Sequence, residues 1–298
     1  MSADIHSARA FLVRQGRLLD RHRSDLVMGA GDPDRVLRAL DAHRNPDGGY
    51  GWSLEPDLRA AGSHPAGALH AFEVLEEVAP ATSPHAAELC DWLGTVERPD
   101  GGLPFVLPID DPTGSSPVWT DADTTTSSLQ ITSAVAALAH RAGGHDPAIA
   151  RHPWLADATR YCLDRIAAID QPETMFVLEL RFALWFLDSI ADERPEAAEH
   201  MQRLAGVIPP AGSLPVPGGA ADEKLRPLDF TPLPDRPLRD LFAADAVAAD
   251  VEQLAAEQRP DGGWTVDFVS ASPGAEQEWR SYATVRAIAI LRAHGVVS

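Results

Sequence analysis

One short sequence recurs three times and constrains how this chain can fold. Pro-Asp-Gly-Gly stands in RNPDGGYGW (44–52), ERPDGGLPF (97–105) and QRPDGGWTV (258–266). The first two copies are 53 residues apart and the last two are 161 apart, which is close to three times that interval. A period near 53 residues therefore runs through the chain, with two degraded copies in the middle, one of them at PPAGSLPVPGG (209–219). Self-similarity of this length is typical of repeat architectures.

Each unit has the same order of elements. An apolar helical segment comes first, as in DRVLRALDAH (34–43) or VEQLAAEQ (251–258). Proline then ends the helix, and the glycines reverse the chain because they enter the left-handed region without a Cβ clash. A loop and a second apolar helix close the unit, as in HPAGALHAFEVLEEV (64–78), SLQITSAVAALAHR (128–141) and YATVRAIAILRAHG (282–295). Apolar residues recur at helical spacing throughout, and β-strand alternation is scarce.

These patterns predict an all-α protein with a single domain over 1–298, built from about five helical hairpins. We expect an N-terminal helix at about 5–22 and repeats from about 30 to 296. The second helix of each unit is the more continuously apolar, so we place it on the inside of a stacked or ring-closed array. ETMFVLELRFALWFLDSI (173–190) is the most apolar segment and should be a buried helix, whereas the Pro- and Gly-rich stretch 207–238 should be a long loop.

Charge and composition exclude several classes of protein. Acidic residues outnumber basic ones by 44 to 25, and a formal charge of −19 repels phosphate backbones, so nucleic acid is not an expected partner. Lys224 is the only lysine, which excludes a Gly-Lys-Ser/Thr phosphate loop. Two cysteines are too few for a disulfide scaffold. Because no segment approaches the roughly 18 apolar residues of a membrane span and none resembles a signal peptide, we expect a cytoplasmic protein without a transmembrane segment.

The repeat resembles the α/α toroid of terpenoid cyclases and protein prenyltransferase β subunits. An aromatic residue follows the glycines at Tyr50 and Trp264, with Leu103 in the second copy. QRPDGGW (258–264) is similar to the Gln-…-Gly-x-Trp signature of squalene–hopene-type cyclases. The resemblance covers about 30–296 and implies a single toroid, but its motifs specify fold more than function.

The segment VWTDADTTTSSLQITSAVAAL (118–138) carries the functional part of the resemblance. At this place in the repeat, class II terpene cyclases have an Asp-x-Asp-Asp motif whose middle aspartate protonates an alkene. Here 121–125 reads Asp-Ala-Asp-Thr-Thr, which resembles the variant of sesquiterpene cyclases that make drimane skeletons from farnesyl diphosphate. The resemblance implies that Asp123 is the general acid and that Asp121 and Thr124 are its partners. Local sequence alone fits equally well a polar helix start at which the aspartates serve as N-caps.

Such an acid must stay neutral until its substrate arrives. Burial disfavours the carboxylate, and a second carboxylate two residues away disfavours it further, so we expect Asp123 in a dry, aromatic-walled hollow. Aromatic faces would stabilise a carbocation. The candidates in or just after the glycine turns are Trp52, Trp119, Trp264, Phe268, Trp279 and Tyr282. For each of them, packing in the core is the competing interpretation.

A prenyl diphosphate would also need positive charge. Arg59 follows the first turn and Arg280 begins the last inner helix, so both are candidate contacts for the phosphates. Glu55 and Asp57 are candidate ligands of a Mg²⁺ ion that bridges to them, since Mg²⁺ prefers one or two carboxylates plus phosphate oxygens. The predicted reaction is protonation-initiated cyclisation of a linear prenyl diphosphate, with farnesyl diphosphate as first choice.

Two alternatives and one departure stay open. Typical class II cyclases place the active site between two helical domains, whereas this chain has room for one, so either one ring encloses the substrate or a second subunit, as in a homodimer, covers it. The first alternative is a glycan-active α/α barrel that pairs Glu55 or Asp57 with Asp123. The second is a non-catalytic toroid that binds a lipid or a protein partner, which solvent-exposed Asp121 and Asp123 side chains would favour.

Overall fold

The chain is α-helical, as the repeat pattern predicts. A computed structural model describes residues 3–297, and within them it has fourteen α-helices and one two-stranded antiparallel ribbon of Leu214–Pro215 (β1) and Lys224–Leu225 (β2). The helices are α1 Ile5–Gln15, α2 Leu18–Val27, α3 Pro33–Leu40, α4 Pro65–Glu77, α5 Ala86–Val96, α6 Pro117–Thr120, α7 Leu129–Gly143, α8 Pro147–Ala150, α9 Pro153–Ala167, α10 Val177–Ile190, α11 Pro195–Ala205, α12 Pro227–Phe230, α13 Ala244–Ala256 and α14 Pro273–Ala293.

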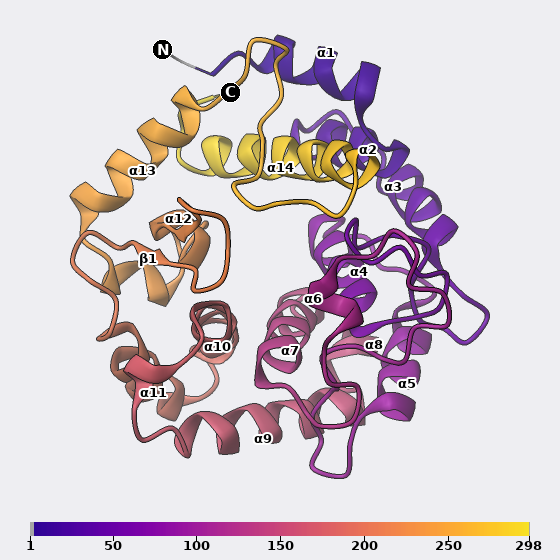
Figure 1. Ribbon diagram of the computed structural model, residues 1–298, viewed down its shortest axis with the longest axis vertical. Helices are drawn as coiled ribbons and strands as arrows, with labels where there is room; N and C mark the ends of the chain where they lie inside the picture. Colours follow the sequence, from indigo (N-terminus) through magenta and orange to yellow (C-terminus); the bar gives the residue numbers. More distant parts are fainter. Residues whose placement is uncertain (1–2, 298) are drawn as a thin grey trace.

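The helices follow one another around a central space in two layers (Figure 1). The outer layer holds α1, α3, α5, α9, α11 and α13, and the inner layer holds α2, α4, α7, α10, α12 and α14. Because α14 packs against both α1 and α2, the last helix of the chain lies beside the first two. The second apolar segment of each clear repeat lies in the inner layer, as α4, α7 and α14.

The three Pro-Asp-Gly-Gly turns share one geometry, and each docks on the next outer helix. Their first glycines have φ values of 93°, 89° and 96° at Gly48, Gly101 and Gly262. A Cβ atom there would lie only 2.1–2.9 Å from a backbone carbonyl oxygen of α5, α9 or α1, respectively. Both the left-handed backbone and the close approach therefore require glycine. The third turn packs against α1. The type of turn that links neighbouring units therefore also joins the two ends of the chain.

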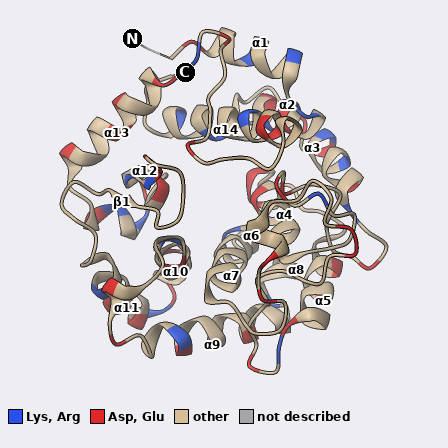
Figure 2. Ribbon diagram, in the orientation of Figure 1, with Lys and Arg blue, Asp and Glu red and all other residues tan. Residues whose placement is uncertain are grey.

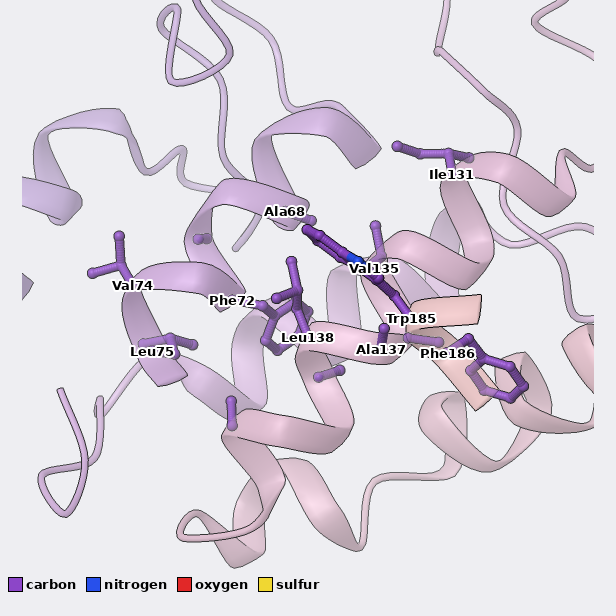
Figure 3. Close-up of a cluster of buried hydrophobic side chains, with 14 of the residues drawn as sticks. Ala68, Phe72, Val74, Leu75, Ile131, Val135, Ala137, Leu138, Trp185 and Phe186 are labelled. Carbon is purple, nitrogen blue, oxygen red and sulfur yellow. The ribbon is translucent and has the colours of Figure 1, made fainter. Parts of the chain in front are cut away.

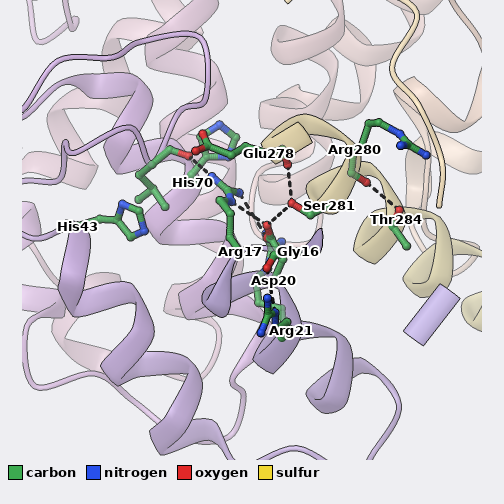
Figure 4. Close-up of polar contacts among 12 residues, drawn as sticks. Gly16, Arg17, Asp20, Arg21, His43, His70, Glu278, Arg280, Ser281 and Thr284 are labelled. Carbon is green, nitrogen blue, oxygen red and sulfur yellow. Dashed lines mark hydrogen bonds and ion pairs between the residues drawn. The ribbon is translucent and has the colours of Figure 1, made fainter. Parts of the chain in front are cut away.

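The N-terminal segment forms two helices, where the sequence predicts a single helix at about 5–22. The first helix ends before Gly16, whose backbone is extended with φ −74° and ψ 150°. The Gly16 N–H donates a hydrogen bond to the carbonyl of Leu12. The second helix, α2, joins the inner layer through the buried carboxylate of Asp20, which accepts hydrogen bonds from Arg17 (2.7 Å) and Ser281 of α14 (2.9 Å) (Figure 4). Residues 5–27 thus form one more outer–inner pair.

The core lies between the two layers and is continuous along the chain. Figure 3 shows its part around α4, α7 and α10, with Phe72 of α4 beside Leu138 of α7 and with Phe186 of α10 further along. Every alanine of α7 is buried, and these small side chains let α4 and α10 approach α7 from both sides. The apolar segment 173–190 contains α10, which begins at Val177 and is largely buried as expected. One cluster of buried apolar side chains extends from Ala8 to Leu291.

The stretch 207–238 is more structured than the long loop that its composition predicts. It contains the β1–β2 ribbon and the short inner helix α12, whose Asp229 side chain accepts the Arg226 N–H (2.9 Å). Charged residues of both signs lie on the outer helices, for example on α9 and α11 (Figure 2). Between residues 3 and 297, no helix is both long and apolar enough to cross a bilayer.

Candidate functional site

A large cavity opens between the inner helices. Its volume is about 1260 Å³, above the range of about 300–1,000 Å³ that is common for small-molecule sites. The wall draws on α4, α6, α7, α10, α12 and α14 and on the loop 264–269. The lining carries charged side chains of both signs and nine aromatic ones, namely Phe105, Trp119, Phe176, Phe182, Trp185, Trp264, Phe268, Trp279 and Tyr282. Of the six aromatic residues predicted from the sequence, all but Trp52 line the cavity.

The aromatic rings form two groups. Phe105 and Trp119 stack with centroids 4.9 Å apart and planes at 15°. Trp279 meets Phe268 (5.2 Å) and Tyr282 (5.4 Å) edge to face. Stacked and edge-to-face pairs are the favourable arrangements of aromatic quadrupoles, so these rings hold one another in place around the open space. The cavity wall therefore offers π faces to an apolar ligand.

A largely buried imidazole in the cavity wall contacts the second aromatic group edge to face. His70 on α4 contacts Glu73 through Nδ1 and Glu55 through Nε2, both at 2.8 Å. Burial alone would lower its pKa, but the two carboxylates outweigh burial and raise the pKa of His70 to about 9. The pKa of Glu73 falls to about 2 despite burial, because the charges of His70 and Arg23 and the Tyr282 hydroxyl favour its carboxylate. This site therefore holds an imidazolium between two carboxylates at neutral pH.

Glu55 and Asp57, the expected Mg²⁺ ligands, line the cavity, but their oxygens already have protein donors. Asp57 accepts hydrogen bonds from Ala271 N (2.7 Å) and Trp279 Nε1 (2.8 Å), while Glu55 accepts one from Asp57 N (3.1 Å) and pairs with His70. Burial raises the pKa of Asp57 above its ordinary value. This donor set does not fit a Mg²⁺ ion, which needs free carboxylate oxygens. Across residues 3–297, no group of three or more His, Cys, Asp or Glu side chains is arranged to hold a metal.

The structure contradicts the expected burial of the Asp-x-Asp-Thr-Thr motif. Asp121 and Asp123 are exposed, and the residues at 121–125 lie outside the cavity wall. Asp123 accepts hydrogen bonds from Thr125 N (2.7 Å), Thr125 Oγ1 (2.6 Å) and Thr126 Oγ1. These bonds favour the charged form and lower the pKa of Asp123 to about 2. Asp123 is therefore a solvated carboxylate here and not a neutral acid.

The partners expected for Asp123 are also arranged differently. Asp121 follows the last residue of α6 and accepts a hydrogen bond from Thr120 Oγ1 (3.1 Å). Thr124 is half-buried, and its carbonyl accepts a bond from Arg98. The N-cap of α7 is Ser128, so the competing interpretation of the aspartates as caps of that helix is wrong as well. A glycosidase-like pair of Asp123 with Glu55 or Asp57 is not formed, because Asp123 lies outside the wall that holds both.

Three further candidates lie away from the cavity wall. Trp52 is 56% exposed and folds back on the first turn, where its Nε1 donates to Asn45 Oδ1 (2.8 Å). Arg59 forms an ion pair with Glu278. Arg280 makes two bonds to Asp261 (2.8 and 2.9 Å) and lies over the ring of Phe11 (4.7 Å). Both arginines are thus neutralised by structural carboxylates.

Several cavity residues were missed from the sequence. Arg181 lines the cavity, with its guanidinium over the rings of Phe182 (5.0 Å) and Trp185 (4.6 Å). Burial, followed by the charge of Arg286, lowers its pKa below the ordinary value, although a guanidinium stays charged at neutral pH. A signal was present, because Arg181 is the only basic residue of the apolar segment 173–190. His70 gave no comparable signal, since its two partners are set by tertiary packing.

Comparison with known proteins adds no assignment. No protein-family model matches this chain, and no curated protein matches its sequence.

Proposed function

We propose that the central cavity binds an elongated hydrocarbon with an anionic end, and that a linear prenyl diphosphate is its ligand. The observation that carries this proposal is the cavity of about 1260 Å³ with nine aromatic side chains in its wall. Burial of apolar surface in such a pocket is favourable in proportion to the area removed from water. The choice of a prenyl diphosphate rests on the resemblance of the repeats to an α/α toroid of the terpenoid cyclase class.

Protonation-initiated cyclisation is the reaction that we propose second, because the geometry supports it less directly. Trp119 in the cavity wall is only four residues from Asp123, so the motif stands close to the wall in the chain. For proton transfer, a bound substrate or a covering subunit would have to remove Asp123 from water and from its threonine donors, which would raise its pKa from about 2. Exposure of Asp123 favours the non-catalytic alternative, a protein that binds a prenyl lipid without converting it.

The experiment combines binding with product analysis. The purified protein is titrated with farnesyl diphosphate, with and without Mg²⁺, and its melting temperature is recorded. Ligand at one hundred times Kd should stabilise the fold by about 2.7 kcal/mol. Products are then treated with phosphatase and analysed for cyclic alcohols. Cyclic product that disappears in Asp123→Ala would establish catalysis, whereas binding without product would establish the binding protein.

A cavity-filling variant provides the structural control. Ala283 of α14 lines the cavity, so Ala283→Trp should prevent binding by occupying the space. Ala249→Trp places the same side chain at an exposed position of the outer helix α13 and should bind as the parent does. If the parent gives neither a shift in melting temperature nor a binding isotherm, or if Ala283→Trp binds as tightly as Ala249→Trp, the proposal is wrong.

A further inference from the structure

Arg181 is a cation without a protein partner in the cavity wall. Among the described residues, no group accepts a hydrogen bond from it, and its buried Nε is unsatisfied. Its guanidinium lies over the rings of Phe182 and Trp185. A charge held out of bulk water without an anion is unfavourable, so an anion supplied from outside would be stabilised there.

The carboxylates that face Arg181 are already paired with other cations. Asp229 bonds to Arg286 of α14 (3.2 Å) and accepts the backbone N–H of Arg226 (2.9 Å). Glu73, the second carboxylate whose charge acts on Arg181, is paired with His70. The cations Arg286 and His70 are thus bonded to the carboxylates Asp229, Glu73 and Glu55, which, within the described residues, leaves Arg181 as the cation of this group without a bonded carboxylate.

We propose that Arg181 anchors the phosphate groups of the cavity ligand; this inference rests on the proposed function. The aromatic rings beneath the guanidinium hold its plane, which leaves its N–H edges free for phosphate oxygens, and bidentate contact of this kind suits arginine better than lysine. Arg286 lies near it but is paired with Asp229. The hydrocarbon end would then lie against aromatic side chains of the wall such as Phe105 and Trp119.

Three probes separate the anionic end from the hydrocarbon end of the ligand. Farnesyl diphosphate carries both ends, farnesol only the hydrocarbon and inorganic pyrophosphate only the anion. The affinity of each is measured for the parent, Arg181→Met, Arg181→Lys and Arg160→Met. Arg160 is exposed on the outer helix α9, so Arg160→Met changes the net charge equally without touching the cavity. Melting temperatures of the four proteins show whether each is folded.

In the parent, farnesyl diphosphate should bind more tightly than farnesol. Arg181→Met should weaken binding of farnesyl diphosphate and pyrophosphate by about tenfold or more, because a charge-assisted hydrogen bond is lost, and should leave farnesol unchanged. Arg181→Lys should retain part of the affinity, and Arg160→Met should bind all three probes as the parent does.

The two proposals fail in different ways. If Arg181→Met binds farnesyl diphosphate as tightly as Arg160→Met does, the anchor is assigned wrongly, while farnesol binding to the parent would still support the proposed ligand class. If the parent binds pyrophosphate through Arg181 but binds neither farnesyl compound, the anion site stands and the proposed function is wrong. Equal affinity of the parent for farnesyl diphosphate and farnesol would also overturn the anchor.

Discussion

At the scale of single residues, His70 makes stability depend on pH in a range where few other groups titrate. Its pKa of about 9 in the folded protein lies above the ordinary value of 6.5. A group whose pKa is raised by folding stabilises fully below its unfolded pKa and loses that contribution as the pH rises through its folded pKa. The free energy of unfolding should therefore fall between pH 6.5 and 9, by an amount on the order of 3 kcal/mol at about 1.4 kcal/mol per pKa unit.

Chemical denaturation at a series of pH values measures this fall. His70→Gln cannot take up the proton, so its stability should be lower and should lack the decline between pH 6.5 and 9. His85→Gln changes a histidine near the surface and should retain the decline of the parent. A parent whose unfolding free energy is flat across this range would show that the imidazolium between Glu55 and Glu73 is not formed.

Asp123 offers a second test at the residue scale, because its low pKa depends on threonine donors. Thr126→Val removes a hydrogen bond to the carboxylate and should raise the pKa of Asp123 from about 2 towards its ordinary value of 3.8. Carbon NMR of the aspartate carboxyls follows the titration. Thr113→Val is the matched control, since Thr113 lowers the pKa of Asp111 in the same way and should leave Asp123 unchanged. An unaltered Asp123 titration in Thr126→Val would contradict the assigned bond.

Residue-level prediction from the sequence was limited by pairings between distant segments. Trp119, Trp264, Phe268, Trp279 and Tyr282 do line one cavity, because each stands at a fixed place in or near a glycine turn. Whether a charge faces that cavity depends instead on its partner. Arg280 forms an ion pair with Asp261, and Asp57 accepts a hydrogen bond from Trp279. Within the described residues the buried Nε of Arg181 has no hydrogen-bond partner. Local sequence does not contain this information.

At the scale of elements, the second glycine of each turn is fixed by packing and not by its backbone angles. Gly102 lies against Tyr161 of α9, and a Cβ atom on it would come within 2.6 Å of the tyrosine ring and of Ser127. Gly102→Ala should therefore lower the free energy of unfolding by about 1–3 kcal/mol, as overpacking of a dense core does. Denaturant titration measures the change. Gly62→Ala is the control, because a Cβ atom there meets nothing within 4 Å and should alter stability by no more than about 0.5 kcal/mol.

Helical elements were predictable where the repeat is clear and less so elsewhere. The three Pro-Asp-Gly-Gly turns and the apolar helices after them follow from glycine conformation and helical periodicity. The segment 5–22 reads as one helix because its apolar residues keep helical spacing on both sides of Gly16, and the break is set by the docking of α2 on α14 through Asp20 and Ser281. The inner helix α12 is only four residues long and carries too little periodicity to be seen in sequence.

At the scale of the whole molecule, the N-terminal helix α1 contacts both the third glycine turn and the last helix, α14. Gly263 of the third turn packs against the ring of Phe11 on α1, and the guanidinium of Arg280 of α14 lies over the same ring, 4.7 Å from its centroid. Gln258 bonds to both the N–H and the carbonyl of Asp4 (2.7 and 2.8 Å). In an open helical array the first helix contacts only its neighbours in sequence. Here α1 supports α14, which forms part of the cavity wall.

Phe11→Ala should therefore disturb both ends of the chain together. Loss of this fully buried ring should lower the free energy of unfolding by about 3–5 kcal/mol. Hydrogen exchange should accelerate in α14 and the third turn as well as in α1. Phe72→Ala removes an equally buried ring that stacks on Trp154 of α9, so its faster exchange should centre on α4 and α9. If Phe11→Ala accelerates exchange in α1 alone, the ends are not coupled, and the cavity wall does not depend on closure of the ring.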